Sequence, residues 1–390
     1  MKLLPIRFMG DKKIWILLLL LAAISILSVY SSTYRQTMKT GNLTGAISRH
    51  VWLLFVGFVV IYFMHLVPLK YYRLLVPIAL LFVIICLTLV FFVQGEAGVA
   101  KRWLFSRSFQ PSDVAKVVMV VYMAKVLSDG FGGSTKQFIY RAIIPLIIVC
   151  GLIITAHTSN VMIIGGTSVL MIFMGASNRR YQIVSALLVF VVITVYLFFY
   201  KDIGRGETGA NRIKTWIVTT FSPGKKTETA AGKKTKEITG YEQARTAKYA
   251  IVSGGFFRIA PGRSVYRKTL SEAHNDYIFA MIVEEYGLLG GISVIAVYLM
   301  LFYRVLQLIK KCRKMFTSLL LSGLLISILV QTFIHIGVSV GGIPVTGQNL
   351  PMISTGGTSI IITCIAFGMI LAVSRAIEES KNSGTVSRKA

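Results

Sequence analysis

Residues 271–291, SEAHNDYIFAMIVEEYGLLGG, decide how this chain folds. The run that begins at Asp276 is apolar enough to cross a membrane as a helix, because about 20 mostly apolar residues span the hydrocarbon core. Yet Asp276 stands at its start, and Glu284 and Glu285 lie within it. An ionised side chain at the centre of such a helix costs roughly 2.5–3.5 kcal/mol and normally faces a cavity or a partner. The stretch therefore predicts a membrane-spanning helix whose carboxylates have a function.

The rest of the chain is equally apolar. Of its 390 residues, 55% are hydrophobic and 15% are charged, which is more apolar surface than one soluble core can bury. We expect an all-α integral membrane protein, a single polytopic domain over residues 1–390. About ten apolar stretches have the length of membrane-spanning helices; they are 14–31, 51–67, 74–93, 113–128, 142–157, 161–176, 182–200, 276–303, 316–338 and 357–376.

The net charge of +27 would indicate a nucleic-acid partner for a soluble protein. In this chain the basic residues instead gather in the segments on one side of the predicted spans. They are dense in 2–13, 304–314 and 375–389, whereas the loop 339–356 on the opposite side has none. Short loops rich in Lys and Arg stay in the cytoplasm. We therefore expect a multi-pass membrane protein with both termini in the cytoplasm, and no nucleic-acid partner.

The fourth extracytoplasmic loop, residues 201–275, is long. Its stretch 222–240 is rich in Lys, Thr and Gly and has no pattern that could bury a face, so we expect it to be flexible. Farther along, Ala247, Ala250 and Ile251 are spaced as on one face of a helix. They predict a short amphipathic helix on the membrane surface.

Cations follow this helix at Arg258, Arg263, Arg267 and Lys268. Next to a membrane, they could bind lipid phosphates or a pyrophosphate. Nonspecific contact with lipid headgroups is the simpler interpretation when the loop is considered alone.

Two more stretches place polar groups at the extracytoplasmic ends of helices. In FQPSDVAK (109–116), Pro111 suits a first helical turn, and Asp113 and Lys116 lie on one face, where they can pair. The segment GGIPVTGQNLPMISTGGTSI (341–360) is rich in glycine, proline and hydroxyl groups. Its irregular backbone is tolerable at membrane depth only where protein or water lines it. We expect it to line a cavity, with N–H groups that could hold an anion.

The face of the helix that carries Asp276 continues through Ala280, Val283 and Gly287, which leave a narrow groove. Glu285 points the other way, so we expect it to pack against a basic residue on another span. His335, within the span 316–338, is expected to be a packing residue whose hydrogen bonds are satisfied.

Three motifs follow one another in this chain: FQPSDVAK, EAHNDYIFAMIVEEYGLLGG and IPVTGQNLPMISTGGTS. The element AKRWL stands before them at 100–104. Together they closely resemble the shape, elongation, division and sporulation family, the FtsW/RodA group of peptidoglycan glycosyltransferases. The resemblance covers nearly the whole chain. It implies an inverting enzyme that polymerises lipid II, an undecaprenyl-pyrophosphate-linked disaccharide pentapeptide, into β-1,4 glycan strands on the outer face of the inner membrane. The strands would serve cell division or elongation, and the motifs favour the FtsW-like branch.

The family's essential acidic residue falls on Asp276, which the resemblance makes the candidate general base. Alternatively, Asp276 holds a divalent cation, Mg²⁺ or Mn²⁺; the sequence predicts no other metal ligands. Lys116 is expected to pair with Asp276 and tune it. The candidates for binding the substrate and its pyrophosphate are Arg102, Lys116, Arg267, Lys268, Glu272, His274, Ser354, Gly356 and Gly357. TAHTSN (155–160) departs from the family pattern, so no function is assigned to it.

The resemblance also implies a partner, a class B penicillin-binding protein that crosslinks the strands by transpeptidation. The alternative function is transport, because a flippase for lipid-linked precursors or a secondary transporter also combines many helices, a polar cavity and intramembrane charges. A transporter needs ionisable residues near the bilayer midplane, whereas these motifs gather at the extracytoplasmic ends of their spans. A scaffold that only positions an enzyme is a third interpretation, under which Asp276 is dispensable.

Overall fold

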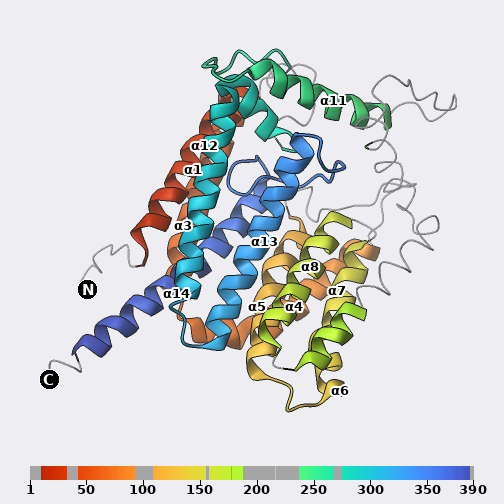
Figure 1. Cartoon of the computed structure of the whole chain (residues 1–390), viewed down its shortest axis with the longest axis vertical. Coiled ribbons are helices and arrows are strands. Elements are labelled where there is room, and N and C mark those ends of the chain that lie inside the picture. The colour runs from red at the N-terminus through yellow and green to blue at the C-terminus, as the bar shows by residue number, and fades with distance from the viewer. Residues whose placement is uncertain are drawn as a thin grey trace.

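The computed structural model describes residues 10–32, 43–92, 109–154, 158–176, 178–187, 216, 237–266, 270 and 275–386. These residues form long helices that stand side by side, with one helix, α11, lying across one end of the bundle (Figure 1). In chain order the helices are α1 (Lys12–Ser32), α3 (Leu43–Leu66), α4 (Leu69–Phe92), α5 (Pro111–Asp129), α6 (Thr135–Phe138), the π-helical turn η1 (Ile139–Ile143), α7 (Ile144–Ile154), α8 (Thr158–Gly175), α11 (Glu237–Gly254), α12 (Ile278–Ile309), α13 (Met315–Ser339) and α14 (Gly357–Val386).

Within the described ranges, eight helices are long and apolar enough to cross a membrane: α1, α3, α4, the continuous run from α6 through α7, α8, α12, α13 and α14. The chain is therefore a multi-pass, all-α membrane protein, as predicted. The predicted span 113–128 is α5, which is less apolar and lies largely buried in the bundle. The predicted span 182–200 is described only as helix at 179–187, so the count of about ten spans stays a prediction.

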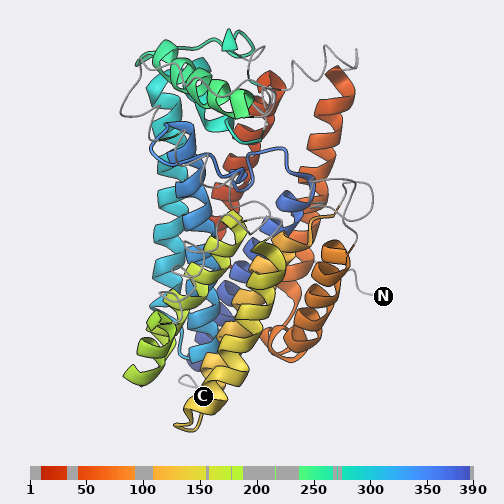
Figure 2. The ribbon, with the colours of Figure 1, turned by 90° about the vertical axis from the view of Figure 1, so that its right-hand side faces the viewer.

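The two ends of the bundle differ. At one end the start of α1 meets the end of α14: the Asp11 amide donates to Ser374 Oγ at 2.9 Å, and the Gly10 amide donates to Glu378 Oε2 at 3.1 Å. Asp11 also forms an ion pair with Arg304 near the end of α12. The other end, called the α11 end below, carries α11 and the loop 340–356 between α13 and α14; Figure 2 shows this blue loop beneath α11.

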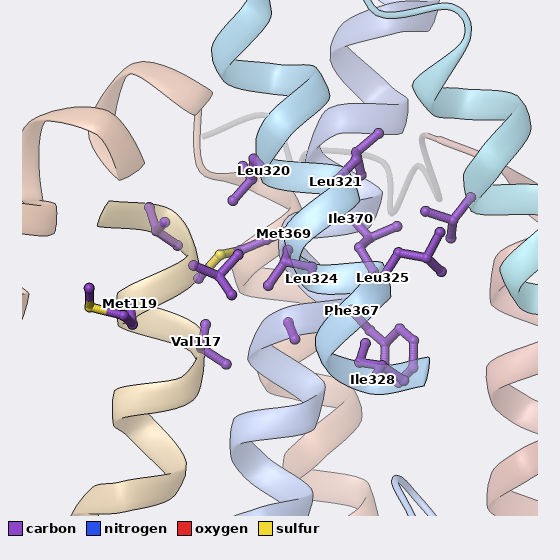
Figure 3. Packing of buried hydrophobic residues seen from close by; sticks show 14 of the residues in the cluster. Val117, Met119, Leu320, Leu321, Leu324, Leu325, Ile328, Phe367, Met369 and Ile370 are labelled. Carbon is purple, nitrogen blue, oxygen red and sulfur yellow. The ribbon is translucent and has the colours of Figure 1, made fainter. Parts of the chain in front are cut away.

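The centre of the bundle is apolar. Figure 3 shows α13 beside α5 and in front of α14, with Leu320, Leu321, Leu324, Leu325 and Ile328 on α13, Val117 and Met119 on α5, and Phe367, Met369 and Ile370 on α14. Gly323 lets α13 approach its neighbours closely, since a Cβ there would lie 2.7 Å from Val120 and 2.5 Å from Met171. Small residues at helix contacts are the usual means of close packing in membranes.

The helix α12 is broken at Gly287, whose φ of 69° and ψ of −176° are not helical. Glycine adopts a positive φ without the steric cost that a side chain brings. Here it allows residues 278–286 to form a separate first segment of α12. This segment positions Asp276 at the α11 end.

The predicted groove along this first segment exists, and α11 fills it. A Cβ on Gly254 would lie 2.1 Å from the Val283 carbonyl oxygen, and Ala247 packs with Ala280 in one buried cluster. The prediction of an amphipathic helix is confirmed, but its apolar face does not lie against lipid, because Ala247 and Ala250 are fully buried and α11 packs mostly against α12. Its place at the membrane surface stays a prediction.

The start of α11 at Glu237 places its first turn inside the stretch 222–240. The remainder of that stretch and residues 201–215 lie outside the described residues. The predicted extent of the long loop 201–275 therefore stays a prediction.

Candidate active site

Asp276 lies at the α11 end, in the turn 275–277 that leads into α12. Its carboxylate is half-buried and faces the loop 340–356: a Cβ built on Gly347 would lie 3.7 Å from Asp276 Oδ2. Gly347 has a φ of +68°, which glycine tolerates. The start of a helix carries a partial positive charge that stabilises a nearby anion. The position therefore suits a carboxylate that acts at the rim of the bundle.

Two neighbouring hydroxyl groups of the loop hold the residue before Asp276. Ser354 Oγ donates to the backbone oxygen of Asn275 at 2.8 Å, and Thr355 Oγ1 donates to Asn275 Oδ1 at 2.8 Å. Ser354 Oγ also accepts from the Leu350 amide at 2.9 Å. Both carbonyl groups of Asn275 are thus fixed by the loop, and this pair of contacts, the Asn275 clamp, orients the turn that carries Asp276.

The loop is anchored in turn to α13. Gln331 Nε2 donates to the Asn349 carbonyl at 2.9 Å, and His335 Nδ1 lies 2.7 Å from the Gln348 carbonyl. Because a carbonyl only accepts, Nδ1 of His335 carries the proton in this contact. The Nε2 of His335 is buried and has no hydrogen-bond partner among the described residues, so the expectation of a fully satisfied histidine was only half right.

A second set of contacts anchors the loop to α8 and α5. Gln348 Nε2 donates to Asn160 Oδ1 at 3.0 Å, and Asn160 Nδ2 donates to Ser112 Oγ at 2.9 Å. Ser159 Oγ donates to the Thr346 carbonyl at 2.8 Å. These bonds explain how an irregular segment exists at this depth, because protein groups satisfy its backbone.

Asp113 and Lys116 form the predicted ion pair, at 3.0 Å and largely buried. Lys116 Nζ also contacts Gln331 Oε1 at 3.3 Å. The expected pairing of Lys116 with Asp276 was wrong. Asp113 lies one helical turn before Lys116 on the same face of α5, so it reaches the ammonium group first, whereas Asp276 precedes a different helix.

The ion pair lines a cavity between α5, α13 and α14. Its volume is about 30 Å³, and it is lined by Asp113, Lys116, Val117, Leu324, Ser327, Ile328, Gln331, Ser359, Ile362, Thr363 and Ala366. This is enough room for bound water and far less than the roughly 300–1,000 Å³ of small-molecule sites. From the segment 341–360, which was expected to line a cavity, Ser359 in the first turn of α14 lines this one, whereas residues 341–356 do not.

Met352, in the same loop, has a φ of 66°, the one positive value at a non-glycine position in the described part of the chain. A left-handed backbone costs an ordinary residue about 1–2 kcal/mol. Such strain persists where the surroundings enforce it, and it clusters at functional sites. Here Met352 is buried two residues before Ser354 of the Asn275 clamp.

The two glutamates of α12 have structural contacts. Glu284 is fully buried and accepts from Ser264 Oγ at 2.5 Å and from the amides of Val265 and Tyr266 at 2.7 and 3.3 Å. Glu285 accepts from Ser31 Oγ on α1. The expectation of a basic partner for Glu285 was wrong within the described residues, because hydroxyl and backbone groups surround this carboxylate. Both glutamates hold the segment 255–266 against the bundle.

The family model described as a cell cycle protein, FtsW/RodA/SpoVE, matches residues 11–379. The chain belongs to this family. A protein named "Probable peptidoglycan glycosyltransferase FtsW" from Idiomarina loihiensis is 30% identical over 75% of this chain and 69% of its own length. The protein of the same name from Lactococcus lactis is 27% identical over 93% and 91% of the two chains.

Solved structures share the fold of this FtsW/RodA-family chain. The rod shape determining protein RodA of Thermus thermophilus aligns with a TM-score of 0.65 at 18% identity, over 94% of this chain and 97% of RodA. A chain from a structure titled "Structural coordination of polymerization and crosslinking by a peptidoglycan synthase complex" aligns with a TM-score of 0.73 at 20% identity, over 94% and 98%. The resemblance seen in the motifs is therefore confirmed at the level of family and fold.

Among the predicted site residues of this family member, Asp276 and Ser354 lie close together through the Asn275 clamp, and Gly356 follows Thr355 of the clamp in the chain. Gly356 is buried, and a Cβ there would lie 2.3 Å from Asn349 Nδ2. Gly357 is the first residue of α14. The other candidates and the AKRWL element at 100–104 lie outside the described residues; these candidates are Arg102, Arg267, Lys268, Glu272 and His274.

Three residues of the site were missed from the sequence: Asn160, Gln331 and Gln348. Asn160 lies in TAHTSN, to which no function was assigned. A signal existed for Asn160 and Gln331, because a lone amide in an otherwise apolar span is rare unless it faces the bundle interior or a partner. Both amides face partners here, whereas Gln348 lies in the loop 340–356, where this signal does not apply.

Proposed function

We propose that this FtsW/RodA-family chain is an inverting glycosyltransferase that polymerises lipid II into β-1,4 glycan strands on the outer face of the bacterial inner membrane. The relatives that carry the name peptidoglycan glycosyltransferase support the reaction class. The observation that carries the proposal is the position of Asp276, a half-buried carboxylate at the start of α12 whose neighbour Asn275 is clamped by Ser354 and Thr355.

In the proposed reaction Asp276 acts as the general base. The 4-hydroxyl oxygen of one sugar attacks the anomeric carbon of another, the bond from that carbon to the pyrophosphate oxygen breaks, and the configuration inverts. The hydroxyl proton passes to the Asp276 carboxylate, and the electron pair of the broken bond leaves with the pyrophosphate. A base must lie within hydrogen-bond reach of the hydroxyl, which a carboxylate held rigidly at the rim allows.

The departing pyrophosphate needs positive charge around it. Arg102, Arg267 and Lys268 are proposed for this role, with Glu272, His274, Ser354, Gly356 and Gly357 as further substrate contacts. Lys116 is proposed to act from within the cavity, where Asp113 holds its ammonium group.

A divalent cation at Asp276 stays an alternative role for this carboxylate. No group of three or more His, Cys, Asp or Glu residues in the described part of the chain is arranged to hold a metal ion. Mg²⁺ often binds through one or two carboxylates together with substrate phosphates and water. Asp276 would therefore suit a cation that the pyrophosphate also holds.

The basic loops support an orientation with both termini in the cytoplasm and the α11 end outside. The names of the relatives support the FtsW-like, cell-division branch. A class B penicillin-binding protein is the proposed partner, since strands must be crosslinked after polymerisation. A solved structure of the same fold, described as coordinating polymerisation with crosslinking, supports this partnership.

Purified protein in liposomes with labelled lipid II tests the function. We expect glycan strands from the parent and none from Asp276→Asn. Asp129→Asn is the matched control, because Asp129 ends α5 away from the site and pairs there with Arg141 at 3.7 Å. Movement of lipid II across the bilayer without polymer would favour transport, and polymerisation by Asp276→Asn at the parent rate would remove the proposed base.

A further inference from the structure

The segment from Val252 to Val265 exposes a set of large apolar side chains outside the membrane-spanning helices. Phe257 and Ile259 are 76% and 89% exposed, and Val252, Phe256 and Val265 are also exposed. Single exposed apolar residues need no explanation, but a contiguous apolar patch marks an interaction surface. This patch is called the 252–265 surface below.

The backbone of this surface is fixed to α12. The Gly255 carbonyl accepts from the Leu288 amide at 2.9 Å, and the Ala260 amide donates to the Glu285 carbonyl at 2.9 Å. A Cβ on Gly287 would lie 2.7 Å from the Phe256 carbonyl oxygen, so the two backbones are in contact. The backbone that carries the exposed side chains is therefore held in place by α12, and their exposure does not result from a loose loop.

The surface lies level with the ends of two membrane-spanning helices. A Cβ on Gly262 would lie 3.6 Å from the ring of Tyr30, in the last turn of α1. Leu288 and Leu289 of α12, which bond to this segment, are themselves exposed, as is Leu27 one turn below Tyr30. The 252–265 surface thus adjoins exposed apolar sides of the membrane-length helices α1 and α12.

Two arginines lie within the segment. Arg258 Nη1 donates to the Ser253 carbonyl at 3.1 Å at the end of α11, whereas Arg263 is exposed. Aromatic and aliphatic side chains beside cations are the combination by which peripheral segments bind the boundary between headgroups and acyl chains.

We propose that the 252–265 surface inserts into the outer boundary layer of the bilayer, with acyl chains around Phe257 and Ile259 and lipid phosphates at Arg263. The same backbone holds the first segment of α12, which begins two residues after Asp276. Insertion of this surface therefore fixes the height of Asp276 relative to the headgroups.

Photocrosslinking tests this directly. The photoreactive residue p-benzoylphenylalanine replaces Phe257 or Ile259 in the full-length protein, which is irradiated in liposomes of phosphatidylethanolamine and phosphatidylglycerol. Leu27, exposed on α1, is the lipid-facing control, and Ser380, exposed near the end of α14, is the water-facing control. We expect phospholipid adducts, identified by peptide mass, at Phe257 and Ile259 as readily as at Leu27, and none at Ser380.

Irradiation of the same variants in cells separates lipid from protein as the occupant. Adducts to phospholipid in cells support the proposal. Adducts to another protein would overturn it and make the surface a docking site, and a pattern like that of Ser380 would show that the surface faces water. Neither readout needs lipid II or turnover, so the result stands apart from the success or failure of the proposed glycosyltransferase activity.

Discussion

Thr355 donates a 2.8 Å hydrogen bond to the side-chain oxygen of Asn275, a residue 80 positions earlier in the chain. Ser354, its neighbour, donates to the backbone oxygen of the same asparagine. The direction of the Asp276 carboxylate thus depends on a loop that is remote in sequence. That loop depends in turn on Gln331 and His335 of α13, so the Asp276 carboxylate is held by successive layers of contacts.

Replacing Thr355 with valine keeps the shape of the side chain and removes its hydroxyl group. A hydrogen bond of this kind contributes about 0.5–1.5 kcal/mol, so we expect polymerisation to fall by roughly 2-fold to 10-fold. Lipid II polymerisation rates measure this effect. Thr355→Ser, which keeps the donor, is the matched control and should retain the parent rate. An equal loss in both variants would mean that packing, and not the bond to Asn275, is what matters.

The buried ion pair of Asp113 and Lys116 predicts a pattern in stability. Lys116→Met leaves the Asp113 carboxylate unpaired, and breaking a buried pair in this way costs about 3–5 kcal/mol. We expect a clear fall in the thermal unfolding temperature of the detergent-solubilised protein. The double variant Asp113→Asn, Lys116→Met removes both charges and should recover most of the loss. A double variant no more stable than Lys116→Met would contradict the pairing.

Features that depend on residues close together along the chain could be predicted from the sequence. Hydrophobic run lengths located the eight membrane-length helices of the described ranges, and Pro111 with Asp113 and Lys116 specified both the start of α5 and its ion pair. These features depend on residues within one or two helical turns of one another. The position of Asp276 at the start of α12 follows from the same kind of local pattern.

Contacts between distant segments could not be predicted. Lys116 was assigned to Asp276 because both are charged and near the same end, but only the three-dimensional arrangement shows that Gln331 and Asp113 surround it. The apolar face of α11 was assigned to lipid, because helical periodicity identifies a buried face without identifying its neighbour. The network around Asn160 and Gln348 joins separate helices, and no pattern along the chain encodes it.

Glu284 anchors the segment that leads toward Asp276, because its carboxylate accepts from the amides of Val265 and Tyr266. Hydrogen bonds to a charged group contribute about 1.5–3 kcal/mol. In Glu284→Gln we expect faster hydrogen exchange at these two amides while the helix α13 stays protected. Glu379→Gln, at an exposed position near the end of α14, is the control. Unchanged exchange in Glu284→Gln would show that the segment is held by other contacts.

Cys312 lies between α12 and α13, outside the membrane-spanning segments, and burial raises the pKa of its thiol to about 11. Only the thiolate reacts readily with alkylating reagents. The thiolate fraction is therefore small at neutral pH, and we expect alkylation by a water-soluble maleimide to rise about tenfold per pH unit up to the pKa. A cysteine at the exposed position of Lys314, made in a variant that lacks Cys312, should level off near an ordinary thiol pKa of about 8.5. Matching pH profiles would contradict the effect of burial.

The close contact between Gly254 of α11 and Val283 of α12 predicts that a larger residue at position 254 displaces α11 from α12. A methyl group in Gly254→Ala would lie 2.1 Å from the Val283 carbonyl oxygen, so one backbone must move. Overpacking of this kind costs about 1–3 kcal/mol. Gly151→Ala is the matched control, because no atom lies within 4 Å of a Cβ at that helical position, and alanine there should be neutral or stabilising. We expect proteolysis within α11 to accelerate in Gly254→Ala alone. Because the displaced helix covers the first segment of α12, lipid II polymerisation should fall in the same variant; full activity together with faster proteolysis would show that Asp276 is positioned without α11.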